Sequence, residues 1–143
     1  MTISRKDFLK AAGAATDAAA AAGSAQAADQ KTAGPTPRKV TAGKDALGRI
    51  SPQFAHFNDD ILFGEVWSRT DKLSAHDRSL ITVAALMSSG ILDSSLEYHI
   101  GYAKENGVSA EEMAEALTQL AFYAGWPKAW AAFRMTKKVY GIE

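Results

Sequence analysis

Large hydrophobic side chains are distributed unevenly along the chain, and they indicate where a folded domain forms. All three Trp, all four Tyr and five of the six Phe lie beyond Ile50. In that region the apolar positions recur every three or four residues, as on one face of a helix, and no convincing alternating strand pattern is present. Because a hydrophobic core needs such residues, the pattern predicts one all-α domain over residues 50–143.

The apolar periodicity and the boundary signals together predict a compact bundle of five to six helices. Ser109 with Glu112 forms a capping box, and a similar pattern starts at Ser74. A glycine follows three of the expected helices, as is common at helix C-termini, and Pro127 suits the first turn of the last one. The predicted helices cover about residues 52–69, 74–89, 93–106, 109–124 and 127–140, with a break in the first near position 58 or 59.

Residues 1–28 have a different composition and resemble an export signal. Arg5 and Lys6 precede residues 11–28, of which 12 are Ala, and Ala25-Gln26-Ala27 is a small-residue cleavage site. Residues 4–10 resemble a twin-arginine signal in which Lys6 stands in place of the second Arg. We therefore expect residues 1–28 to be a signal peptide of a periplasmic or otherwise exported protein.

A second interpretation of this segment is a disordered or loosely helical tail on a cytoplasmic protein, and Asp17 within the apolar region favours it. A stable membrane span is not expected, because the apolar run falls short of the ~20 residues that cross a bilayer. Residues 29–49 are rich in Gly, Pro, Thr and charge and contain few large apolar side chains. They are expected to form a flexible linker.

Charge and Cys content exclude several classes of function. The 143 residues include 16 basic and 16 acidic side chains, so no basic excess favours nucleic-acid binding. Six of the basic and three of the acidic residues lie within residues 1–39, which places a basic leader before an acidic domain. The absence of Cys excludes disulfides, zinc–cysteine sites, iron–sulfur clusters and thiol catalysis. The high aromatic content of a domain of this size predicts that apolar surface is buried between subunits.

Among the residues of the chain, His99 is the strongest candidate for a chemical role. It is expected on the apolar face of the third helix, where a His is either a packed core or interface residue or a catalyst. Its ring titrates near neutral pH, and either nitrogen can donate or accept a proton. Glu97 lies two residues away on a different side of the helix, so the two are not expected to pair within it. With Asp93, Glu97 is most simply part of a solvated acidic face.

Arg78 and a group of aromatic residues are candidates for binding. Arg78 has no carboxylate three or four positions away on its own helix, so it either forms an ion pair with another part of the fold or binds a substrate carboxylate. His76, in the first turn of that helix, is expected to be exposed. The aromatic residues are expected to form core, subunit interface or a substrate wall; they are Tyr123, Trp126, Trp130 and Phe133.

No motif indicates a bound cofactor or metal. The three His residues, at positions 56, 76 and 99, do not have the spacing of metal ligands. No phosphate-binding glycine loop follows a strand, and no Gly-x-Ser-x-Gly nucleophile elbow occurs.

Three segments in the helical region, 73–86, 96–112 and 121–129, match one known family in order and spacing. They read LSAHDRSLITVAAL, LEYHIGYAKENGVSAEE and AFYAGWPKA, and the stretch from the first to the last, residues 73–129, is 57 of the 143 residues. The first resembles the first signature helix of the carboxymuconolactone decarboxylase family. The second resembles its His-containing helix with the turn that follows, and the third resembles its Tyr-x-Gly-x-Pro step.

The family's redox branch carries a Cys-x-x-Cys pair whose second Cys lies four residues before the His. Leu92 and Ser95 occupy those positions here, and neither forms a thiolate, so thiol peroxidase activity is excluded. The chain resembles instead the decarboxylase branch. That resemblance implies an all-helical, alkylhydroperoxidase D-like subunit that assembles into homotrimers or homohexamers and uses no cofactor.

The resemblance also implies an activity, the decarboxylation of 4-carboxymuconolactone or a related acid in aromatic catabolism. It implies that His99 is the proton donor or oxyanion partner, that Arg78 binds a substrate carboxylate, and that Glu97 orients a His of its own or a neighbouring subunit. Tyr123 and Trp126 would line the substrate site. The alternative is a non-catalytic oligomer of the same fold that binds a small acid or a partner protein.

Overall fold

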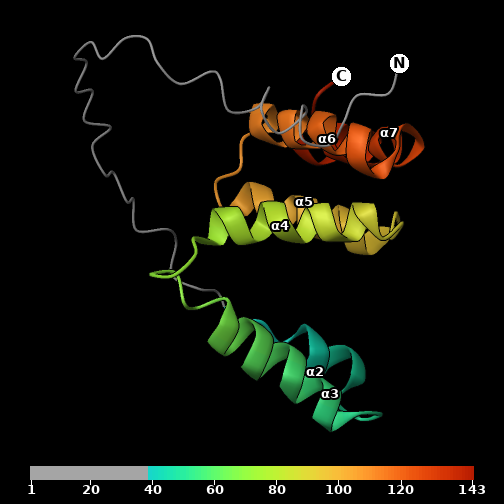
Figure 1. Ribbon diagram of the computed structural model, residues 1–143. Helices are drawn as coiled ribbons and strands as arrows, with labels where there is room; N and C mark the ends of the chain where they lie inside the picture. Colours follow the sequence, from blue (N-terminus) through green and yellow to red (C-terminus); the bar gives the residue numbers. More distant parts are fainter. Residues whose placement is uncertain (1–38) are drawn as a thin grey trace, which may run out of the picture. The chain divides into compact units, whose positions relative to one another are not determined.

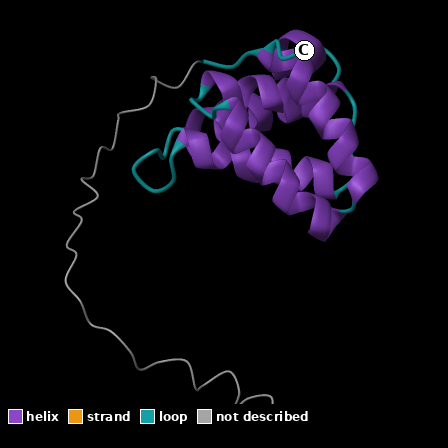
Figure 2. Cartoon of the chain, turned by 90° about the horizontal axis from the view of Figure 1, so that it is seen from above, coloured by secondary structure: helices purple, strands orange, loops and turns teal. Residues whose placement is uncertain are grey.

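The structure is a computed structural model that describes residues 39–143, and these residues are entirely helical with connecting loops (Figures 1 and 2). This confirms the predicted all-α class. None of the described helices is both long and apolar enough to cross a membrane. The predicted signal peptide and the first part of the predicted linker lie outside the described residues. The elements are α2 (Ala42–Leu47), α3 (Pro52–His56), the π-helix η1 (Phe57–Val66), α4 (Ala75–Ser88), α5 (Ser94–Glu105), α6 (Ala110–Ala124) and α7 (Trp126–Tyr140).

Helices α4 to α7 enclose one hydrophobic core. Helix α4 packs on α5 and α6 packs on α7, as Figure 1 shows, and α5 also contacts α7. The apolar stripe predicted for 109–124 is the buried face of α6. Buried residues of the core are Val83, Met87, Leu96, Ile100, Ala103, Val108, Met113, Leu117, Ala121, Ala129 and Ala132.

The predicted helix boundaries of this core are confirmed by their caps. The Ser74 hydroxyl accepts a hydrogen bond from the Asp77 backbone N–H at 3.0 Å. Ser109 and Glu112 form a complete capping box at the start of α6. Gly107 and Gly125 have φ angles of 90° and 105°, which side-chain-bearing residues rarely adopt. Local sequence therefore specifies where these helices begin and end.

The structure differs from the prediction for residues 42–66. Helix α2 lies inside the segment predicted to be a flexible linker, and it is held by a residue distant in sequence. Its N-cap, Thr41, makes no side-chain capping bond. Instead, the buried Asp59 carboxylate accepts hydrogen bonds from the backbone N–H groups of Gly43 and Lys44, both at 2.8 Å. Asp59 thus satisfies two N–H groups that a helix start leaves unpaired.

The predicted break near position 58 or 59 is replaced by a change in helix type. Helix α3 ends at His56 and the chain continues directly as the π-helix η1. Asp59, on η1, is among the few buried polar residues, together with Ser79 and Thr136. Burial alone would raise the pKa of Asp59, but hydrogen bonds from Asn58 and from the Lys44 and Gly43 N–H groups lower it below the usual value.

Candidate active site

His99 lies at the edge of the buried face of α5, beside the core residues Leu96 and Ile100. Its ring is half-buried, and Nδ1 is a buried side-chain atom without a hydrogen-bond partner among the described residues. Burial lowers the pKa of His99 below its ordinary value of 6.5. The imidazole is therefore neutral at pH 7, when one ring nitrogen carries a proton and the other accepts one.

Aromatic rings pack next to His99. The Tyr98 ring lies edge-on to the imidazole, with 5.1 Å between centroids and 83° between planes. Tyr98 is also nearly parallel to Tyr102, at 6.2 Å and 12°. Tyr102 in turn contacts Trp67 at 5.2 Å and Phe63 at 6.1 Å, so the cluster links α5 to η1.

These four aromatic residues are not among the candidates predicted from the sequence. The spacing of Tyr98 and Tyr102 places them one turn apart on the same helix, and this is a signal that they contact each other. No local signal links that pair to Phe63 and Trp67, because the contact depends on how η1 packs against α5.

Glu97 does not approach His99 within the subunit. Positions 97 and 99 are about 200° apart around a helix, so their side chains diverge. The Glu97 carboxylate pairs with Lys138 on α7 at 2.6 Å. Asp93 is the N-cap of α5 and accepts a hydrogen bond from the Ser95 N–H at 2.8 Å. The predicted acidic face does lie at the surface, with Asp93 exposed and Glu97 partly exposed, but each carboxylate has a partner: one caps a helix and the other joins two helices.

Arg78 binds backbone carbonyl groups of the loop that precedes α4. Its Nε donates to the carbonyl of Leu73 and its Nη2 to that of Arg69, both at 3.2 Å. No carboxylate of residues 39–143 forms an ion pair with it. Arg78 therefore forms no ion pair within the described part of the chain, which was the first of its two interpretations. The positive charge of its guanidinium is available to bind an anion, which was the second.

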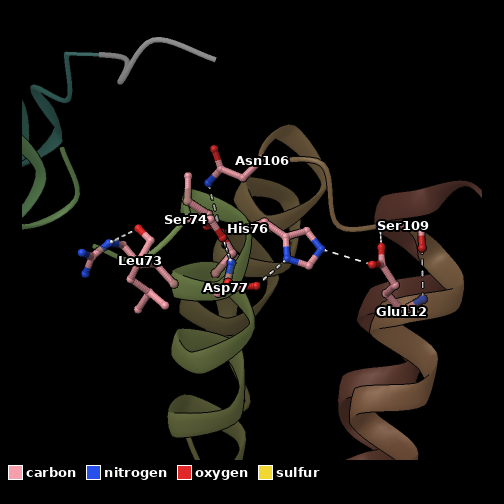
Figure 3. A network of polar contacts seen from close by, with 10 residues as sticks. Leu73, Ser74, His76, Asp77, Asn106, Ser109 and Glu112 are labelled. Atoms are coloured by element: carbon pink, nitrogen blue, oxygen red, sulfur yellow. Dashed lines mark hydrogen bonds and ion pairs between the residues drawn. The ribbon is translucent and has the colours of Figure 1, made fainter. Parts of the chain in front are cut away.

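His76 joins the starts of α4 and α6, contrary to the prediction that it is exposed (Figure 3). Its side chain is 29% exposed, with Nδ1 2.9 Å from Asp77 and Nε2 3.3 Å from Glu112. The contact to His76 lowers the pKa of Asp77, and the Ser109 backbone N–H is the main cause of the lowered pKa of Glu112. Both carboxylates are therefore ionised at neutral pH, and His76 is held in a structural cluster.

Tyr123 and Trp126 are not core residues of the subunit. They are 81% and 56% exposed, and Trp130 on the same surface is 64% exposed. A groove of about 330 Å³ between α6 and α7 is lined by Thr118, Ala121, Trp126, Ala129, Trp130, Phe133 and Lys137. This surface is suited to a subunit interface or to a substrate wall. No ring contact or hydrogen bond among the described residues joins it to His99.

A second cavity, of about 380 Å³, lies beside the aromatic cluster. Its lining combines the start of α2 with the outer face of α5, and it includes Tyr98, the ring that packs on His99. Charged side chains on its wall are Lys39, Asp45 and Glu105. Within residues 39–143, no group of three or more His, Asp or Glu side chains is placed to hold a metal ion.

Comparison with known proteins relates the chain to one family. The family model described as the carboxymuconolactone decarboxylase family matches residues 52–138. A 4-carboxymuconolactone decarboxylase of Acinetobacter baylyi is 34% identical to the chain over 103 residues. That alignment covers 72% of this chain and 75% of the Acinetobacter protein. The family match includes α3 to α6 and most of α7, and therefore contains His99 and its aromatic neighbours.

Proposed function

The chain belongs to the carboxymuconolactone decarboxylase family, and from this premise we propose that it is a cofactor-free carboxy-lyase acting on 4-carboxymuconolactone or a related acid. The supporting observation is His99, a half-buried neutral imidazole in the family's His-containing helix. The absence of Cys agrees with a decarboxylase and not with a thiol peroxidase.

The reaction makes three demands on the protein. The C–CO₂⁻ bond breaks and CO₂ departs, and the electron pair that remains is delocalised into the conjugated lactone as an enolate. That charge must be stabilised, and a proton must be returned to carbon. A neutral imidazole can donate its N–H as a hydrogen bond to the developing oxyanion. To return a proton to carbon, the ring first takes a proton from water and then gives it up as imidazolium, so that it ends the cycle neutral. We assign both roles to His99.

Arg78 is the proposed partner of the substrate carboxylate. Two of its nitrogens are bound to backbone carbonyls, which fixes the guanidinium, and no described carboxylate neutralises it. A guanidinium held in this way suits a carboxylate ligand. Tyr123 and Trp126 are proposed to line the substrate site. Glu97 is proposed to orient a His of a neighbouring subunit, because its own His99 lies on another side of α5.

The proposal includes a homotrimer or homohexamer, because α6 and α7 carry several exposed aromatic side chains. It also includes export to the periplasm with cleavage after Ala27, for which the composition of residues 1–28 is the support. Intact-mass measurement of the protein from a periplasmic extract tests cleavage. An uncleaved chain found in the cytoplasm would contradict it.

The activity is tested by incubating the purified protein with 4-carboxymuconolactone and following CO₂ release. We expect turnover, and we expect His99→Gln to lower kcat by about 10²- to 10⁴-fold, the usual contribution of a general acid or base. His56→Gln is the matched control and should retain the wild-type rate, because His56 is exposed on α3 and pairs with Asp60.

Two outcomes would contradict the proposal. A folded wild-type protein without turnover above background would exclude this substrate. His99→Gln with the wild-type rate would exclude the assigned role of His99. The alternative, a non-catalytic oligomer that binds a small acid, predicts unchanged binding of the acid by His99→Gln in isothermal titration calorimetry.

A further inference from the structure

We propose that Tyr98 is a positioning residue that holds the His99 imidazole in its working orientation through ring packing. This inference rests on the proposed function of His99. A catalytic imidazole is usually oriented by a hydrogen bond, and here a neighbouring aromatic ring would orient it instead. Tyr98 itself is held through Tyr102 by the two buried rings Phe63 and Trp67 at η1 and its C-cap.

The Nδ1 atom of His99 lacks the partner that usually orients a catalytic imidazole. In a catalytic His, the nitrogen that faces away from the substrate commonly binds a carboxylate or carbonyl, and that bond fixes the ring orientation and the tautomer. Nδ1 of His99 is buried and has no such partner among the described residues. Glu97, the nearest carboxylate in sequence, is bound to Lys138. The ring must therefore be held by packing.

The Tyr98 ring makes a directional contact with the imidazole. It stands nearly perpendicular to His99 at 5.1 Å, a favourable edge-to-face arrangement of two aromatic rings. Such a contact has a preferred direction, so it resists rotation of the imidazole about χ2. It also covers part of the ring and keeps water from it, which favours the neutral form.

Tyr98 is in turn held by other rings. Its side chain is 50% exposed, and an exposed ring has considerable rotamer freedom unless it is packed on one side. Tyr102 supplies that packing, with 12° between the two planes. Tyr102 contacts Phe63 and Trp67, which are only 8% and 7% exposed. The π-helix η1 is thus the fixed support of a ring series that ends at His99.

The test compares Tyr98→Leu, which removes the ring, with Tyr98→Phe, which keeps the ring and removes only the hydroxyl. Phe54→Leu is the matched control, because Phe54 is a ring of similar exposure on α3. The first readout is the NMR titration of the His99 ring protons, which needs no substrate. The second is kcat and KM for decarboxylation.

We expect Tyr98→Leu to shift the pKa of His99 toward its ordinary value. We also expect it to lower kcat by about 10- to 100-fold with little change in KM, because small misplacement of a reacting group has effects of that size. Tyr98→Phe and Phe54→Leu should both keep the wild-type His99 titration and the wild-type kcat. Tyr98→Met, also without a ring, repeats the test if Tyr98→Leu does not fold.

An unchanged His99 titration in both ringless variants would overturn the proposal, and it would point to a partner for Nδ1 from another subunit. An equal loss of activity in Tyr98→Phe and Tyr98→Leu would also overturn the proposal. The Tyr98 hydroxyl, and not the packing of its ring, would then be what activity requires. If no variant and no wild-type protein decarboxylates the lactone, the proposed substrate fails, while the titration still decides the role of Tyr98.

Discussion

At the scale of single residues, the chemistry of this chain depends on where a titratable group is placed relative to the core. Three His residues have different surroundings: His56 is exposed beside Asp60, His76 bridges two carboxylates, and His99 is half-buried without a hydrogen bond at Nδ1. Burial disfavours the charged form of an imidazole, and it lowers the pKa of His99. The His99 ring is therefore neutral at pH 7, and no described residue binds its Nδ1.

The stability of the protein should therefore depend on His99 in mildly acidic solution. Because the pKa of His99 is lowered by folding, the unfolded state binds more protons once the pH falls below about 6.5, and the free energy of unfolding decreases with falling pH. We expect urea unfolding between about pH 7.5 and pH 5.5 to show this loss in the wild type and a flatter dependence in His99→Gln. Equal pH dependence of the two proteins would contradict it. Asp77 and Glu112, whose pKa values are also lowered, lose their contribution only at lower pH in both proteins.

Residue-level prediction is accurate for position where the signal is local and is incomplete where it is not. His99 was predicted on the apolar face of its helix from the residues around it in sequence, and it lies at the edge of that face, while its chemical role stays a prediction. The contact of Glu97 with Lys138 and that of Tyr102 with Trp67 join different helices, and a one-helix pattern contains no information on either. The same reason explains why His76 was expected to be exposed: its second carboxylate, Glu112, belongs to α6.

At the scale of elements, α4 to α7 have boundaries specified by their own residues, while α2 does not. Helices α4, α5 and α6 have capping side chains within three residues of their starts, so they could be predicted from sequence. Helix α2 has six residues and no side-chain cap of its own. A helix so short is unstable alone, and Asp59 stabilises it from η1.

Removal of the Asp59 carboxylate should therefore release α2 without unfolding the core. In Asp59→Ala the N–H groups of Gly43 and Lys44 lose their acceptor, and we expect their hydrogen exchange to become much faster. Amides of α4 to α7 should exchange as in the wild type. Asp71→Ala is the control, because Asp71 is exposed and pairs with its neighbour Lys72. Continued slow exchange of Gly43 and Lys44 would show that other contacts hold α2.

The junction between α6 and α7 offers a second test at this scale. Gly125 has a φ of 105°, and the space that a Cβ would occupy there is open to a distance of 4 Å, so an added methyl group meets only backbone strain. We expect Gly125→Ala to lower the free energy of unfolding by about 1–3 kcal/mol, because its φ of 105° and ψ of 140° lie in a region that few residues other than glycine adopt. A Cβ at Gly101 would also find open space, but Gly101 lies within the helix α5, where Ala is the better helix former. Gly101→Ala should therefore raise the free energy of unfolding by about 0.5–1 kcal/mol. Chemical denaturation measures both, and equal effects of the two variants would contradict the backbone argument.

At the scale of the whole molecule, the described residues bury mostly medium-sized side chains and, apart from Phe63 and Trp67, leave many large aromatic ones exposed. The fully buried set consists of residues such as Met87, Leu96 and Leu117, while Trp126 and Trp130 are more than half exposed. Exposed apolar surface of this extent is uncommon on a protein that functions as a monomer. The composition predicted more apolar surface than one subunit buries. Only the structure shows that much of this exposed apolar surface lies on α6 and α7.

The aromatic surface of α6 and α7 should hold subunits together. Phe122, Tyr123, Trp126 and Trp130 are 73%, 81%, 56% and 64% exposed. At about 150–250 Å² per aromatic side chain, their exposed parts amount to roughly 400–700 Å², most of the ~800 Å² that each partner buries in a stable interface. We expect the wild type to sediment as a trimer or hexamer and Trp130→Ser to dissociate at micromolar concentration, because a central Trp often dominates such an interface. Phe54→Ser, which removes an exposed ring from α3, should leave the assembly intact. A monomeric wild type would contradict this prediction and would leave the surface free to bind substrate or another protein. Dissociation by both variants alike would show that α6 and α7 are not the specific interface.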